Sequence, residues 1–264
     1  MTRETPMIHL LSAAGRAALG DFIDQGTLLA FDLDGTLAPI VVDPAGIMIP
    51  EEIRERLICL NRMAPVAIIT GRARADAQRH LGFQPRFLVG NHGAEGLPGR
   101  ERQEEEFYRK CGEWRDQLEL LMPKASKYGI VMENKGATLS LHYRRCFDPD
   151  AAKSAILRAI RRLQPAPRRV SGKFVENIVP PDAPHKGDAL LQIMRQTGCS
   201  RAVFIGDDAT DEDVFRLADD RILGVRIGCE SASLAGYCLS DQEEMLELLN
   251  EMVSLKTLQG KVTL

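Results

Sequence analysis

Two carboxylates separated by one residue follow an apolar run near the start of the chain. Residues 28–31 are apolar, Asp32 and Asp34 come next, and a Gly-Thr turn follows at once. Two acids this close repel each other unless a cation or a shared proton relieves them. The carboxyl end of a strand is also where open α/β sheets bind ligands. By itself, however, the pair is more typical of a solvated Asp-Gly turn, so its interpretation depends on the rest of the chain.

A second acidic cluster ends a later apolar run. Residues 202–205 are apolar, and Asp207 follows them after a single glycine. Carboxylates at two strand ends of one parallel sheet converge on a cation that prefers oxygen ligands, and Mg²⁺ is the natural choice. The acids that come next also suit the first turn of a helix, with Thr210 as its cap. For Glu212 and Asp213 we favour that structural interpretation.

Thr70 and Lys186 are two further polar residues at element boundaries. Thr70 ends the apolar run Val66–Ile69 and precedes Gly-Arg, which by itself suits a helix cap. Lys186 begins a predicted helix, where a cation is unfavourable against the helix dipole. A lysine in that position is a candidate for a functional charge, although a lone example is more often structural.

The elements that must position these residues alternate between strands and helices. We predict strands at Thr27–Phe31, Val66–Ile69, Phe87–Val89, 202–205 and 223–227, and helices over 9–24, Glu51–Met63, Arg74–Leu81, 185–196, 210–218 and from 242 onward. Strongly apolar strands at strand–helix–strand spacing predict an α/β fold with a doubly wound, Rossmann-like parallel sheet.

The middle of the chain has a different pattern. A long helix is predicted up to Leu121, and strands that alternate better follow at 129–133, 138–143, 168–170 and 174–179, with a helix over 151–163. The change predicts an α+β unit inserted into the α/β core. We therefore expect a core built from residues 1–98 and 183–264, and an inserted domain over 99–182. The proline-rich stretch 180–184 suits a rigid hinge between them.

Composition sets further bounds. The chain has 264 residues and a formal net charge of −3, so it lacks the basic footprint of a nucleic-acid-binding protein. Its six cysteines are scattered without a Cys-x-x-Cys pair. We therefore expect neither a zinc site nor disulfides, but reduced thiols in a cytoplasm. No apolar run reaches the length of a membrane span, and we recognise no signal peptide.

In chain order, the four polar pieces resemble the four signatures of the haloacid dehalogenase (HAD) superfamily of phosphotransferases. They are Asp-Leu-Asp-Gly-Thr at 32–36, Thr70, Lys186 and Gly-Asp-Asp-Ala-Thr-Asp-Glu at 206–212. Further motifs resemble those of the trehalose-6-phosphate phosphatase family. They are His-Gly-Ala-Glu at 92–95, Glu-Asn-Lys-Gly at 133–136, Leu-His-Tyr-Arg at 141–144 and the stretch 172–180. The resemblance implies a HAD-like core with an inserted cap domain that closes over a sugar phosphate.

The resemblance implies distinct roles for the acids of the core. Asp32 would be the nucleophile and give an aspartyl-phosphate. Asp34 would protonate the leaving sugar oxygen and then act as the base for the hydrolytic water. Asp207, Asp32 and the backbone carbonyl of Asp34 would hold Mg²⁺.

The resemblance also implies roles for the residues around these acids. Thr70 and Lys186 would bind phosphate oxygens, and Asp208 and Asp211 would orient the metal and the lysine. The expected substrate contacts are Gly35, Gly71, Arg72, Asn91, His92, Gly93, Glu133, Lys135, Arg144 and Glu176.

Two departures from the family pattern concern the sugar. Related phosphatases usually place a glutamate one position after Glu176, where this chain has Asn177, and an arginine often stands where it has Gly96. A one-residue shift turns a strand side chain to the opposite face. Either the strand bulges so that Glu176 still points inward, or Asn177 replaces the acid and sugar selectivity changes.

The resemblance thus predicts an Mg²⁺-dependent phosphatase of trehalose 6-phosphate. We expect a cytoplasmic enzyme that binds neither nucleic acid nor membrane, and that either stands alone or associates with trehalose-6-phosphate synthase. Two alternatives stay open. One is a HAD phosphatase that acts on sucrose, mannosylglycerate or glucosylglycerol phosphate, and the other is a catalytically silent regulatory module of the same fold.

Overall fold

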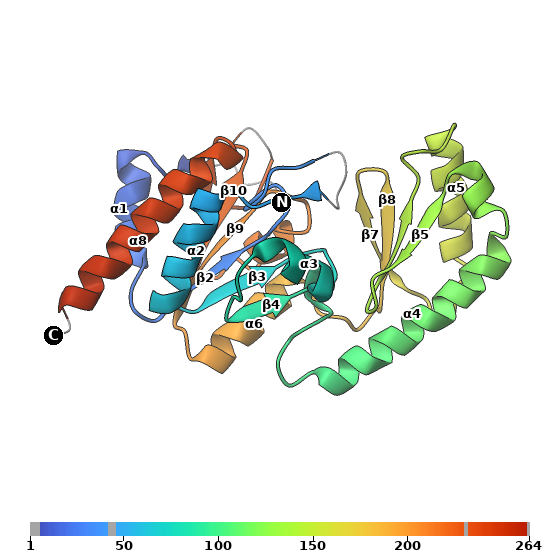
Figure 1. Ribbon diagram of the computed structural model, residues 1–264, viewed down its shortest axis with the longest axis horizontal. Coiled ribbons are helices and arrows are strands. Elements are labelled where there is room, and N and C mark those ends of the chain that lie inside the picture. The colour runs from blue at the N-terminus through green and yellow to red at the C-terminus, as the bar shows by residue number, and fades with distance from the viewer. Residues whose placement is uncertain (1–5, 42–45, 230–231, 263–264) are drawn as a thin grey trace. The chain divides into compact units, whose positions relative to one another are not determined.

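The computed structural model describes residues 6–41, 46–229 and 232–262. The chain divides into two compact units (Figure 1). The first unit comprises Met1–Gly93 and His185–Leu264, and the second comprises Ala94–Pro184. The boundaries expected from the sequence, 98/99 and 182/183, lie a few residues inside the second unit.

A parallel sheet forms the centre of the first unit. Within the described residues its order is β1 (Ile8–His9), β11 (Tyr237–Leu239), β10 (Ile222–Ile227), β9 (Arg201–Gly206), β2 (Thr27–Phe31), β3 (Val66–Ile69) and β4 (Phe87–Val89). Every neighbouring pair is parallel. All residues of β2 and β3 are buried, as all-apolar strands covered on both faces should be. The predicted doubly wound parallel sheet is confirmed.

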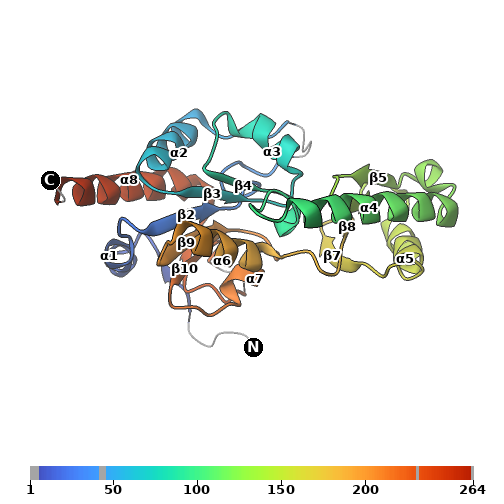
Figure 2. The same cartoon turned by 90° about the horizontal axis from the view of Figure 1, so that it is seen from below.

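Helices cover both faces of this sheet. They are α1 (Ala13–Phe22), α2 (Glu51–Met63), α3 (Arg74–Leu81), α6 (Lys186–Thr197), α7 (Glu212–Phe215) and α8 (Met245–Val262). Figure 2 shows α2 and α3 on one face and α6 and α7 on the other. Helix α2 begins directly after Pro50 and carries Glu51 and Glu52 in its first turn, where acids favour the positive end of the dipole.

Helix α7 is much shorter than the predicted helix over 210–218. Its C-terminal side continues in turns with bonds three residues apart, from Leu217 N to Val214 O and from Ala218 N to Phe215 O. Ala218 has a φ of 48°. A left-handed residue cannot continue a right-handed helix, so the helical pattern of the sequence ends early here.

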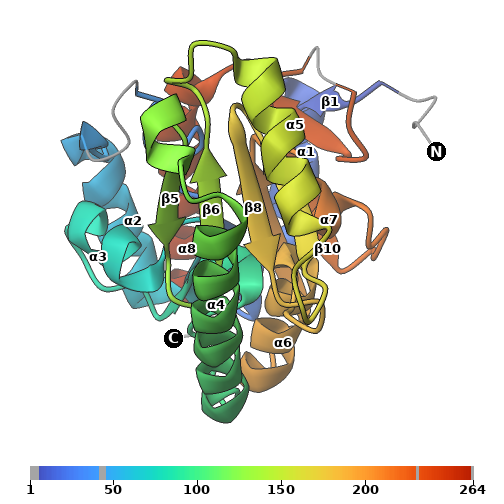
Figure 3. The same cartoon turned by 90° about the vertical axis from the view of Figure 1, so that its right-hand side faces the viewer.

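The second unit is described throughout and contains an antiparallel sheet. The strand order is β5 (Val131–Asn134), β6 (Leu139–His142), β8 (Val175–Val179) and β7 (Arg168–Gly172). Helices α4 (Glu101–Leu121) and α5 (Pro149–Ile160) pack on one face of it (Figure 3). Trp114 of α4 and Ile156 of α5 belong to the same buried cluster as Leu139, Leu141 and Ile178 of the sheet. This arrangement leaves the opposite face of the sheet for polar side chains.

Cys229 and Cys238 form a disulfide with their Cα atoms 5.2 Å apart. The expectation that all six thiols are reduced is therefore wrong for this pair. Parallel pairing of β10 and β11 brings the two residues together, since Arg226 is registered with Cys238. The sequence separation of nine residues matches no cysteine motif, which is why the sequence did not reveal the bond.

No helix among the described residues combines the length and the apolar character that crossing a membrane would require.

Candidate active site

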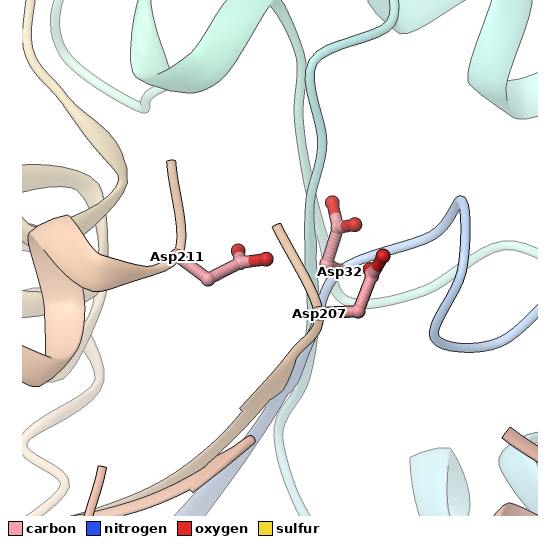
Figure 4. Close-up of side chains that lie close together, drawn as sticks. All are labelled: Asp32, Asp207 and Asp211. Atoms are coloured by element: carbon pink, nitrogen blue, oxygen red, sulfur yellow. The ribbon is translucent and has the colours of Figure 1, made fainter. Parts of the chain in front are cut away.

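The two acidic clusters meet at the carboxyl ends of β2 and β9. These strands are neighbours, with Phe31 registered with Ile205. Asp32 follows β2, and Asp207 and Asp211 follow β9. One carboxylate oxygen from each of these three residues lies within 4.8 Å of the other two, and Asp211 points toward the other pair (Figure 4). The structure thus brings together acids that lie far apart in the sequence, as parallel strand ends predict.

The surroundings of Asp32 and Asp207 oppose the ionisation of these two acids. Burial, together with the charges of Asp211 and Asp207, raises the pKa of Asp32 well above its usual value, although Lys186 acts in the opposite direction. Burial and the charge of Asp211 raise the pKa of Asp207 to about 6, against the lowering effect of a hydrogen bond from Thr36 Oγ1 at 3.0 Å. A cation between the carboxylates would remove this repulsion. The cluster therefore fits a divalent metal, which prefers such oxygen ligands.

Lys186 supplies the cation that the protein itself places in the cluster. It is the first residue of α6, and its Nζ donates to Asp32 Oδ1 at 2.8 Å and to Asp211 Oδ1 at 2.7 Å. Burial alone would lower the pKa of Lys186, but the two carboxylates raise it above its usual value. These two partners offset the unfavourable helix dipole, which explains a lysine at a helix start.

Asp34 is held by an arginine that we expected to contact substrate. Arg72 donates from Nε to Asp34 Oδ2 at 2.7 Å and from Nη2 to Oδ1 at 2.6 Å, and its Nη1 reaches Asp76 Oδ2 at 2.8 Å. Burial would lower the pKa of Arg72, but these two acids raise it. The bidentate pair fixes the carboxylate plane of Asp34. Sequence reasoning missed this pairing, although β3 lies next to β2 and Arg72 follows its end.

The segment after β3 packs against the segment after β4. Thr70 Oγ1 accepts a hydrogen bond from Arg72 N at 3.2 Å, and His92 N donates to Thr70 O at 2.9 Å. Asn91 N donates to Arg72 O at 2.7 Å. A Cβ at Gly71 would lie 2.4 Å from His92 Cε1, so only glycine allows this approach. Together with Gly93 of the turn η2 (Asn91–Gly93), these predicted residues gather at the same edge of the sheet as Thr70.

Two glycines allow the acidic residues to come close to the backbone. Gly35 has a φ of 83°, and a Cβ there would lie 2.1 Å from Asp207 Oδ2. A Cβ at Gly206 would lie 2.2 Å from Asp211 Cγ. Glycine at both positions is therefore required by the packing of the acids, and the predicted contact Gly35 belongs to the acidic cluster.

The other expected sugar contacts lie in the second unit, where the sheet separates them. Glu133 Oε2 lies 2.8 Å from His142 Nε2 and 4.0 Å from Lys135 Nζ. Lys135 pairs with Thr138 at one end of the β5–β6 hairpin, whereas Arg144 lies beyond the opposite end of β6. There the guanidinium of Arg144 lies 5.7 Å from the centre of the Phe174 ring. The structure thus groups Glu133 with Lys135, but not with Arg144.

The register of β8 decides between the two alternatives for Glu176. The pairs Leu141–Glu176 and Ser140–Asn177 follow one another without an extra residue. Glu176 is buried and accepts a hydrogen bond from Ser171 Oγ at 2.8 Å, and Lys153 Nζ of α5 lies 3.9 Å away. The expected substrate contact Glu176 therefore lies on the helix-covered face, away from Glu133.

Asn177 takes the position on the open face. Its Oδ1 accepts a hydrogen bond from Ser140 Oγ at 2.6 Å, and its Nδ2 donates to Val170 O at 3.2 Å. Ser140 is registered with Glu133 on the neighbouring strand, so these side chains share one face. The open face near Glu133 therefore carries the neutral amide of Asn177, which is the second of the two alternatives.

The loop after β9 is fixed from several sides. Asp208 N donates to Asp211 Oδ2 at 2.8 Å, and Arg226 Nη1 donates to Asp208 O at 2.9 Å. Asp208 thus acts on Asp211 through its backbone. Glu212 lies in the first turn of α7, as we expected, and it also accepts a hydrogen bond from Ser233 Oγ at 2.6 Å. No local sequence pattern predicts this contact between Glu212 and Ser233, which are 21 positions apart.

Comparisons with known proteins agree on one family. The model of the trehalose-phosphatase family matches residues 30–237. A probable trehalose-phosphate phosphatase of Sinorhizobium fredii is 32% identical over 237 residues, which cover 83% of this chain and 86% of the relative. The probable trehalose-phosphate phosphatase 4 of Oryza sativa is 28% identical over 244 residues, and the match covers 87% of this chain and 66% of that longer protein.

A solved structure has the same fold. The C-terminal domain of the trehalose-6-phosphate phosphatase of C. albicans superposes with a TM-score of 0.72 at 23% identity, covering 95% of this chain and 99% of that domain. With a family match that spans most of the sequence, both acidic clusters included, the chain belongs to the trehalose-phosphatase family.

Proposed function

We propose that the chain is a phosphoric monoester hydrolase that converts trehalose 6-phosphate to trehalose. The observation that carries this proposal is the cluster of Asp32, Asp207 and Asp211 around Lys186, in a chain that the trehalose-phosphatase model matches. It combines a nucleophile, a set of metal ligands and a fixed cation, which phosphoryl transfer requires.

Asp32 is the proposed nucleophile. Its Oδ1 is occupied by Lys186, which leaves Oδ2 to attack phosphorus. The phosphorus–oxygen bond to the sugar breaks as the aspartyl-phosphate forms, and Asp34 gives its proton to the leaving oxygen. Asp34 then takes a proton from water, which attacks phosphorus and releases inorganic phosphate and free Asp32.

Arg72 holds Asp34 between these steps. Both oxygens of Asp34 are bound to the guanidinium, so the carboxyl group must turn away from Arg72 to reach the leaving oxygen. Asp76 stays bound to Arg72 and can keep the guanidinium in place. We propose that Arg72 acts on Asp34 rather than on the sugar.

Mg²⁺ is the proposed metal, held by Asp32, Asp207 and the backbone carbonyl of Asp34. When bound, the ion neutralises the acidic cluster and polarises the phosphoryl oxygens. Asp211 is fully used by Lys186 and by Asp208 N, so its proposed role is to orient the lysine. Thr70 and Lys186 are the proposed ligands of the phosphate oxygens.

The second unit is the proposed sugar-binding cap, and it includes residues 99–182, the range expected from the sequence. Glu133, Lys135, His142 and Asn177 of its open face offer charged and neutral hydrogen-bonding groups suited to sugar hydroxyls. The neutral Asn177 favours one competing proposal, a phosphatase for another disaccharide or glycoside phosphate. Sucrose, mannosylglycerate and glucosylglycerol phosphates are the alternatives, because each also offers several hydroxyls.

A phosphate-release panel tests the proposal. Trehalose 6-phosphate, glucose 6-phosphate and the three alternative substrates are compared with Mg²⁺ and after chelation by EDTA. We expect Mg²⁺-dependent release that is fastest from trehalose 6-phosphate. A faster alternative would reassign the substrate, and absence of release from every compound would support a silent regulatory module.

A partner follows from the same proposal. We propose that the enzyme associates with trehalose-6-phosphate synthase, because that enzyme would supply the substrate. Co-elution of the two purified proteins in size-exclusion chromatography tests the association, and separate elution at micromolar concentrations would contradict it.

A further inference from the structure

Glu212 is the first residue of α7 and directly follows Asp211, yet its carboxylate does not face solvent. Its side chain is 13% exposed. Ser233 Oγ donates to Oε1 at 2.6 Å, and Leu234 N donates to Oε2 at 3.1 Å. Both oxygens therefore bind the segment that leads from β10 to β11, about twenty positions further along the chain.

Arg226 of β10 strengthens the same connection. Its Nη1 donates to Asp208 O at 2.9 Å and lies 3.5 Å from Glu212 Oε1. Ala235 N donates to Ser233 Oγ at 3.0 Å, which fixes the hydroxyl that binds Glu212. The disulfide between Cys229 and Cys238 joins the start of this segment to strand β11.

The acidic loop, residues 207–211, is fixed to Lys186 at its other end. Asp211 Oδ1 accepts from Lys186 Nζ, and Asp211 Oδ2 accepts from Asp208 N. The loop therefore has attachments on two sides: Lys186 of α6, and the β10–β11 segment through Glu212 and Arg226. A loop attached at one side only can move away from Asp32. A loop attached at both sides keeps Asp207 at a fixed distance from Asp32.

The neighbouring Asp213 shows what an ordinary helix acid does at this place. It accepts a hydrogen bond from Arg216 Nη1 one turn along at 3.1 Å, and among the described residues its side chain makes no hydrogen bond to the β10–β11 segment. Helix α7 has four residues, too few for a strong dipole that would by itself explain two acids at its start. Glu212 and Asp213 are adjacent in sequence and differ in what they hold.

We propose that Glu212 is a positioning residue that fixes the acidic loop to the β10–β11 segment and so keeps Asp207 at the distance from Asp32 that a divalent cation requires. The inference rests on the proposed function, because it assumes that these acids bind a metal. Residues that orient metal ligands from outside typically change metal affinity by about 10–100-fold when they are replaced.

The test compares Glu212→Gln, Ser233→Ala and the matched control Asp213→Asn. Glutamine keeps the shape of the side chain but has one acceptor oxygen, so it cannot accept from both Ser233 Oγ and Leu234 N as the carboxylate does. Mn²⁺ is the probe, and its binding to the purified full chain is measured by electron paramagnetic resonance. We expect the Mn²⁺ dissociation constant to rise about tenfold in Glu212→Gln, less in Ser233→Ala, and to stay within twofold in Asp213→Asn.

Two further measurements separate positioning from a purely structural role. Thermal unfolding identifies a temperature at which every variant is folded, and Mn²⁺ binding is measured there. At saturating metal, the KM for the sugar phosphate should stay within twofold, because the loop contacts the metal site and not the sugar. The double variant Glu212→Gln/Ser233→Ala should bind Mn²⁺ about as weakly as Glu212→Gln alone, because the two substitutions disrupt the same connection between α7 and the β10–β11 segment.

The outcomes are distinct. Unchanged Mn²⁺ affinity in a folded Glu212→Gln variant, or equal weakening in Asp213→Asn, would overturn the proposal. If Glu212→Gln does not fold, the Mn²⁺ affinity of Ser233→Ala tests the proposal instead, because that variant loses only the hydroxyl that binds Glu212. Altered Mn²⁺ binding in a chain that hydrolyses no sugar phosphate would leave the positioning role standing and overturn the proposed function instead.

Discussion

The acidic cluster of the first unit and the open sheet face of the second unit carry the predicted site residues in opposite surroundings. Asp32 is 4% exposed and Lys186 is 1% exposed, and each is bound to a specific partner. On the open face, the side chains of Glu133 and His142 are 49% and 39% exposed. In the first region a single change leaves another charge buried and unpaired, whereas in the second region water can replace a lost contact.

The difference suggests a division of labour within the chain. In the proposed function, the buried cluster performs the phosphoryl transfer, which requires fixed charges in place before the reaction begins. In the same proposal, the open face selects the sugar. We therefore expect changes in the cluster to affect both turnover and stability, and changes on the open face to affect substrate affinity alone.

The largest effect is expected from Asp32→Asn. The amide keeps an oxygen for Lys186 but removes the nucleophile, so turnover should fall by about a thousandfold or more. Phosphate release with Mg²⁺ is the measurement, and circular dichroism verifies that the variant is folded. Turnover that stays near the wild-type value would assign the nucleophile elsewhere. It would also contradict the assignment of the chemistry to the acidic cluster rather than to the open sheet face.

Lys186→Met tests whether the cluster also governs stability. The variant leaves Asp32 and Asp211 buried without their shared cation, so the free energy of unfolding should fall by about 3 kcal/mol. Urea unfolding in the presence of EDTA measures the loss, with Lys124→Met in the second unit as a control at an exposed lysine. Equal stability of the two variants would show that the cluster tolerates the loss of its cation.

The cluster should give the metal-free protein a distinct pH dependence. Asp207 has a pKa of about 6 in the folded state, above the ordinary carboxyl value of 3.8. Between these values the folded state keeps a proton that the unfolded state releases, so stability falls as pH rises from about 4 to about 6, by about 1–3 kcal/mol. Asp32, whose pKa is also raised, acts in the same direction.

Urea unfolding at a series of pH values with EDTA measures how the free energy of unfolding changes with pH. Subtracting the curve of Asp207→Asn isolates the contribution of that carboxyl from those of surface acids. Added Mg²⁺ should reduce the difference, since the ion favours the ionised carboxylate. A flat difference curve would show that the charges of the cluster are already balanced without a metal.

The smallest effect on stability is expected from Glu133→Gln on the open face. The change removes a charge that is exposed to water, so the free energy of unfolding should stay within about 0.5 kcal/mol of the wild type. The KM for trehalose 6-phosphate should rise by about fivefold with little change in kcat, if Glu133 binds a hydroxyl in both the ground and the transition state. A large fall in kcat would place Glu133 among the groups that act on the reaction itself.

The parts of the fold that the sequence predicted well are those with a strong local signal. The strands Thr27–Phe31, Val66–Ile69 and Phe87–Val89 agree with the structure at both ends, because each apolar run is bounded by polar or turn residues. The two-residue strand β1 and the three-residue strand β11 are too short to show a period. They form because β10 offers a partner edge to β11, and β11 offers one to β1.

The site was predictable where residues stand at strand ends, and not where register or long-range pairing decides. Asp32 and Asp207 could be placed together because parallel strands end at one edge of a sheet. The partner of Asp34 could not be predicted, because the reach of Arg72 depends on a side-chain conformation. The face of the sheet on which Glu176 lies depends on the register of β8 against β6. The sequence of β8 alone does not specify that register.

Gly35 has a genetic consequence. A β-carbon there would lie 2.1 Å from Asp207 Oδ2, and the residue already adopts a φ of 83°. Every missense change in a glycine codon adds a β-carbon, so position 35 has no mild allele. A variant at this codon should behave as a loss-of-function allele even when it encodes alanine, the smallest alternative side chain.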